Sequence, residues 1–75
     1  MNVTQAEFQN MKEETIKDLV SFRIEETGCT LQRALDDVYR SILFKKLCNP
    51  ETGLYFQSSR YVYSYLKDEL ENRSK

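Results

Sequence analysis

The sequence predicts a small all-α domain, a compact bundle of three to four helices, and three observations support this. Apolar side chains recur at intervals of three and four residues over most of the 75-residue chain, which is the spacing of one helical face. Residues that favour helix starts, such as Thr4 and Thr30, stand directly before these apolar runs. A single Pro/Gly turn and one short apolar segment interrupt the pattern before the last helix. We therefore expect one helical domain covering residues 1–75.

The first predicted helix covers about residues 5 to 26. Thr4 and Glu7 have the spacing of a capping box, in which each side chain accepts a hydrogen bond from the backbone amide of the other residue. Gly28 follows the expected end, where a left-handed residue closes a helix at little cost.

This first helix has an unusually wide apolar face, made of two stripes. The first stripe consists of Phe8, Met11, Thr15, Leu19 and Phe22. The second stripe, rotated by about 100° around the helix axis, consists of Ile16, Val20 and Ile24. A face this wide needs two neighbours. Either the helix is central in the domain, or its C-terminal half contacts a second copy of the chain.

Two further helices are expected before the turn. Thr30 caps the first of them, whose apolar stripe consists of Leu31, Ala34, Leu35, Val38 and Ile42. The phase of the pattern changes near Ser41, which can cap a short third helix containing Leu43, Phe44 and Leu47.

The segment Asn49–Gly53 predicts a turn, because Pro50 fixes its own φ and Gly53 tolerates a positive φ. The apolar segment Leu54–Gln57 follows, and we expect it to form an extended, buried strap across the helices.

Ser58 or Ser59 caps the last predicted helix. Its core face is expected to hold Val62, Tyr65, Leu66 and Leu70, and its solvent face Lys67, Asp68, Glu71 and Arg73. Residues 72–75 are expected to fray.

Charge and composition argue against several functions. The chain has 11 basic and 12 acidic residues, so it lacks the positive field that would attract nucleic acids or anionic membranes. The start of the sequence lacks the pattern of an export signal, and no apolar run reaches the roughly 20 residues of a membrane span. We expect a soluble, cytoplasmic protein without a membrane partner, and the charge balance disfavours a nucleic-acid partner.

No catalytic, cofactor or metal site is predicted. The chain has no histidine, the commonest general base, and its two glycines do not form a phosphate-binding loop. We therefore expect no enzymatic activity and identify no small-molecule ligand. Cys29 and Cys48 are expected to be structural thiols, although a disulfide or a shared metal stays open.

The stretch from Ala34 to Leu70 carries a Pro-x-Thr-Gly-Leu-Tyr motif followed by Ser and Tyr-Val. The matching residues are Ser41, Leu47, Pro50, Thr52, Gly53, Leu54, Tyr55, Ser58, Tyr61, Val62, Leu66, Glu69 and Leu70. In this stretch the chain resembles a family of small bacterial proteins of unknown function, of the kind found in Firmicutes. The resemblance implies a bacterial, cytoplasmic origin and an antitoxin-like or accessory role, and it supplies no catalytic residues.

The predicted function is that of a protein–protein interaction module, which binds a protein partner or a second copy of itself. The candidate surface consists of the second stripe, Ile16, Val20 and Ile24, together with Tyr55, Arg60, Tyr61 and Tyr63. Tyrosine and arginine are frequent at interaction hot spots, although tyrosine also serves in half-buried packing. Dimerisation through the second stripe is the favoured version.

The alternative is a helix-turn-helix regulator that binds nucleic acid. Its second helix would expose Gln32, Arg33, Asp36, Asp37 and Arg40. Two aspartates on that face would lie beside phosphates, which disfavours this alternative.

Overall fold

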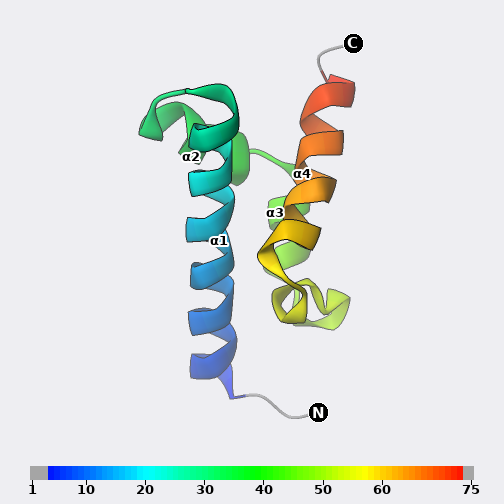
Figure 1. Ribbon diagram of the computed structural model, residues 1–75. Helices are drawn as coiled ribbons and strands as arrows, with labels where there is room; N and C mark the ends of the chain where they lie inside the picture. The colour runs from blue at the N-terminus through cyan, green and yellow to red at the C-terminus, as the bar shows by residue number, and fades with distance from the viewer. Residues whose placement is uncertain (1–3, 74–75) are drawn as a thin grey trace.

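The computed structural model describes residues 4–73 of the chain (Figure 1). Within this range the chain forms four α-helices and two short 3-10 helices, and no strand. In chain order they are α1 (Gln5–Thr27), α2 (Leu31–Tyr39), α3 (Ile42–Leu47), η1 (Pro50–Thr52), η2 (Leu54–Phe56) and α4 (Ser59–Arg73). The predicted all-α bundle is confirmed. Of the tail expected to fray, residues 72 and 73 continue α4, and residues 74 and 75 lie outside the described range.

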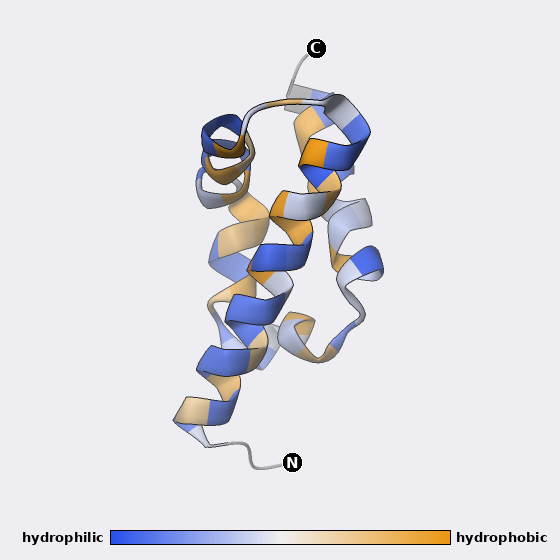
Figure 2. Cartoon of the chain, turned by 60° about the vertical axis from the view of Figure 1, so that its left-hand side comes forward, coloured by the Kyte–Doolittle hydropathy of each residue, from blue (hydrophilic) through white to orange (hydrophobic). Residues whose placement is uncertain are grey.

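Helix α1 is the central element of the fold. The capping box predicted at Thr4 and Glu7 is present, and Gly28 closes the helix with a φ of 70°. The helix packs against α2, α4 and η2. Figure 2 shows hydrophilic segments recurring along α1 between hydrophobic ones, as expected of a helix that buries one side and exposes the other.

The two long helices, α1 and α4, run in the same direction through the molecule (Figure 1). Their core residues include Leu19 of α1 and Val62 and Leu66 of α4, all fully buried. The ring of Tyr63 packs edge-on against that of Phe22, with centroids 5.4 Å apart. This layer of apolar side chains fixes the distance between the two helices.

Helices α2 and α3 begin where the sequence predicts, each at a capping hydroxyl. The Thr30 side chain accepts the amide of Arg33, and the Ser41 side chain accepts the amide of Phe44. The predicted stripe is nevertheless wrong at both ends, because Leu31 is 60% exposed and Ile42 is 58% exposed. Both are the first residue of their helix, and a side chain there extends past the end of the packed face.

The predicted extended strap is also wrong, because residues 54–56 form the 3-10 helix η2. The amides of Phe56 and Gln57 donate to the carbonyls three residues earlier, those of Gly53 and Leu54. Gly53 enters this turn with a φ of 70°. The burial of the segment is predicted correctly at Tyr55, whose ring packs edge-on against Phe8 at 4.8 Å.

In α4 the prediction exchanged two tyrosines. Tyr63 is buried, whereas Tyr65, expected in the core, is 47% exposed. The buried face of α4 centres on Val62 and Leu66, and Tyr63 flanks it on the side of α1, where Phe22 lies. Tyr65 flanks the same face on the side of α3, where the residues of the two helices leave a groove.

Candidate binding groove

A groove of about 540 Å³ lies between α3 and α4 and is bordered by η1 and η2. Residues 61, 65 and 69 of α4 line it, and their spacing of four places them on one helical face. From α3 come Ile42, Leu43 and Lys46. The remaining lining residues, Thr52, Leu54 and Gln57, belong to the 3-10 segment and its end. The groove is thus assembled by three segments that the turn at residues 49–53 brings together.

The lining of the groove is largely apolar and partly exposed. Leu43 is buried and Leu54 half-buried. Ile42 is 58% exposed, and Tyr61 and Tyr65 are each 47% exposed. Three of the large exposed apolar side chains of the described chain therefore meet around one hollow. Convergence of this kind is a property of binding surfaces, whereas single exposed apolar residues are ordinary.

Glu69 holds the groove together by capping α3 from α4. One carboxylate oxygen, Oε2, accepts the amide of Ile42 at 2.8 Å, and the other, Oε1, accepts the amide of Leu43 at 3.0 Å. Ser41 supplies a third acceptor, for the amide of Phe44. The first amides of a helix have no partner within the helix, so a six-residue helix gains a well-satisfied start. No local sequence pattern predicts this contact, because Glu69 lies 26 and 27 residues away from the amides it caps.

Tyr61 and Tyr65 form a pair at the rim of the groove. Their hydroxyl oxygens are 2.8 Å apart, and their rings meet edge-on with centroids at 5.2 Å. The hydrogen bond with Tyr65 raises the pKa of Tyr61 above its ordinary value, because it favours the protonated phenol. At neutral pH the phenol of Tyr61 therefore keeps its proton.

Most of the residues predicted to form an interaction surface lie in the core instead. Ile16 and Val20 are buried in the apolar core of the single chain, and so are Tyr55 and Tyr63. The prediction that Ile16 and Val20 form a dimer surface is therefore wrong. The wide apolar face of α1 is explained by the central position of this helix. The tyrosines are buried because they pack on Phe8 and Phe22 of α1.

Three candidate surface residues remain at least partly accessible. Ile24 is half-buried and packs against the core. Arg60 is exposed, and its guanidinium lies over the ring of Phe22 at 4.2 Å. Tyr61 alone among the predicted surface residues lines the groove. Sequence reasoning missed Ile42, Lys46 and Tyr65, since the first and last were assigned to the core and Lys46 has no distinguishing neighbours.

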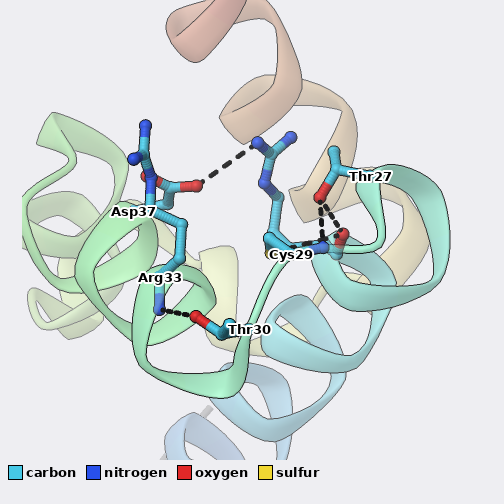
Figure 3. Close-up of polar contacts among 6 residues, drawn as sticks. Thr27, Cys29, Thr30, Arg33 and Asp37 are labelled. Carbon is cyan, nitrogen blue, oxygen red and sulfur yellow. Dashed lines mark hydrogen bonds and ion pairs between the residues drawn. The ribbon is translucent and has the colours of Figure 1, made fainter.

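A second hollow, of about 570 Å³, is lined mainly by charged residues of α1, α2 and α4. Figure 3 shows Asp37 of α2 beside Arg33, close to the turn that holds Thr27, Cys29 and Thr30. Asp37 accepts from Arg33 and from Arg23 of α1, each at 3.3 Å. On the face that a helix-turn-helix protein would direct at phosphates, Arg33 is thus paired with Asp37 of the same helix, and Asp37 is also paired with Arg23 of α1.

Cys29 and Cys48 are both free and half-buried, so no disulfide joins them. No cluster of three or more metal-ligating side chains occurs within residues 4–73. Over the same range, every helix is either too short or too polar to cross a bilayer.

No protein-family model, curated protein or solved structure matches this chain. The resemblance to a Firmicutes-type family accordingly stays a prediction.

Proposed function

We propose that the protein is a non-catalytic interaction module that binds a protein partner through the groove between α3 and α4. One observation carries this proposal: the exposed side chains of Ile42, Tyr61 and Tyr65 converge on a single hollow. Interfaces concentrate aromatic and apolar anchors at a desolvated centre. An antitoxin-like or accessory role, as the family resemblance implies, would use this same surface.

Hydrogen bonds also hold the backbone segments that line the groove. Glu69 fixes the start of α3, and local backbone hydrogen bonds close each of the short helices η1 and η2. A preformed surface loses less conformational entropy on binding, because its backbone is already held by such hydrogen bonds.

Site-specific photo-crosslinking tests the proposal. A photoreactive phenylalanine analogue replaces Tyr65 in one variant and Tyr39 in another, since Tyr39 on α2 is 51% exposed and lies outside the groove. We expect the variant at position 65 to form a discrete covalent adduct with a protein in extract of the native cells, and the variant at position 39 to form none. Equal labelling from both positions, or no adduct from position 65, would contradict the proposal.

A further inference from the structure

The charges around the groove indicate what chemistry its partner carries. Two charged residues line the groove, Lys46 and Glu69. Both oxygens of the Glu69 carboxylate already accept backbone amides of α3. The ammonium of Lys46 forms no ion pair within the described part of the chain. The ammonium of Lys46 is therefore the charged group of the groove that is left to pair with a ligand, whereas the carboxylate of Glu69 is already held by two amides of α3.

The hydrogen-bonding groups at the rim point to the same kind of ligand. In the pair of Tyr61 and Tyr65, one hydroxyl donates to the other, so one hydroxyl proton remains for an outside acceptor. Carbonyl and carboxylate oxygens are such acceptors. Leu43, Leu54 and the exposed side chain of Ile42 supply the apolar contacts.

We propose that the groove binds a short peptide segment of its partner in which an acidic side chain stands beside a large apolar one. The apolar side chain packs between Ile42 and Tyr61, and the acidic side chain pairs with Lys46. A volume of about 540 Å³ accommodates a few side chains, within the usual range of pockets for small ligands. This inference rests on the proposed function, because it names the ligand of the same groove.

Selection from a display library of random short peptides tests the charge preference. The immobilised full chain is expected to enrich peptides with Asp or Glu next to Leu, Ile or Phe. Lys46→Glu is expected to bind the enriched peptides about tenfold more weakly, since an attraction becomes a repulsion at a partly exposed site. It should instead enrich peptides that carry Lys or Arg. Lys45→Glu is the matched control, because Lys45 is exposed on the same helix and does not line the groove.

The folded state of each variant is checked by circular dichroism and thermal unfolding. Lys46→Met keeps most of the apolar stem and removes the charge, so it is expected to lose the preference for acidic peptides even if Lys46→Glu unfolds. If Lys46→Glu and Lys46→Met enrich the same peptides as the unaltered chain, the proposed ligand chemistry is overturned.

A second pair of variants separates this inference from the proposed function. Ile42→Ser is expected to abolish peptide binding, whereas Leu31→Ser is not; both residues begin a helix and are about equally exposed. If Ile42→Ser abolishes binding while the Lys46 variants change nothing, the groove is an interaction site that does not read charge. If no peptide is enriched, the peptide inference fails and the crosslinking at position 65 alone decides the proposed function. If Ile42→Ser binds the peptides normally, both proposals fail. A dimer in light scattering that Ile42→Ser dissociates would assign the groove to a second copy and overturn the peptide proposal.

Discussion

The carboxylate of Asp18 accepts a hydrogen bond from the hydroxyl of Ser59 at 2.5 Å, across 41 residues of sequence. Asp18 lies near the middle of α1, and Ser59 is the first residue of α4. The neighbouring Ser58 caps α4 by accepting the amide of Tyr61. Two adjacent serines, both predicted as possible caps, thus have different tasks: one begins the helix and the other attaches that helix to α1.

Ser59→Ala and Asp18→Ala are each expected to lower the free energy of unfolding by about 1.5 kcal/mol, as for a hydrogen bond to a charged group. Because both remove the same contact, the double variant should lose little more than either single one. Urea denaturation measures this. Ser64→Ala is the control, since Ser64 is exposed and bonds only within its own helix. Fully additive losses would show that the contact contributes nothing.

Glu69→Gln is expected to destabilise the fold by about 1–2 kcal/mol, because an amide has one acceptor oxygen for the two amides that the carboxylate caps. Hydrogen exchange should show faster opening at Ile42 and Leu43 than in the unaltered chain. Asp68→Asn removes a charge from the adjacent, exposed position and should leave both observables unchanged. Unchanged exchange in Glu69→Gln would contradict the capping role.

Asp37→Asn is expected to cost about 1–2 kcal/mol of stability, since the half-buried guanidinium of Arg23 loses its anionic partner. The lost contact joins α1 to α2, so thermal unfolding should begin at a lower temperature. The matched variant Asp36→Asn, at an exposed position on the same helix, should shift the midpoint little. Equal shifts in the two variants would argue against a specific role for Asp37.

Tyr65→Phe is expected to lower the pKa of Tyr61 toward its ordinary value, because the hydrogen bond that raises this pKa is lost. Because the pKa of Tyr61 is raised in the folded state, its hydrogen bond contributes fully to stability at pH values below the ordinary pKa of 10.0. This contribution is lost as the pH rises through the pKa of the folded state. NMR titration of the Tyr61 ring measures the shift. A pKa of Tyr61 that does not change in Tyr65→Phe would refute the coupling of the two hydroxyls.

The local pattern of the sequence was sufficient to predict the helix starts. Thr4, Thr30 and Ser41 each cap the helix they were expected to cap, because capping depends on residues three positions apart. The predicted extended conformation of residues 54–56 is wrong, because the positive φ of Gly53 and the local hydrogen bonds that follow it favour a 3-10 helix.

The groove could not be predicted, because it depends on contacts between distant segments. Helical periodicity left Tyr63 and Tyr65 on either side of the same face, and only the position of Phe22 on α1 decides which one is buried. The cap that Glu69 places on α3 likewise requires α3 and α4 to lie side by side. Only Tyr61 was identified in advance from its residue type and neighbours.

Because Glu69 caps α3, the positions of the groove differ in how well they tolerate substitution. Ile42, Lys46 and Tyr65 are exposed and can be exchanged to suit another partner with small loss of stability. Glu69 is not free to change with them, because its replacement also removes hydrogen bonds that cap α3. Among descendants of this chain, an acidic residue conserved at position 69 beside varying neighbours would indicate selection for folding. The positions that vary would then indicate differences in the ligand.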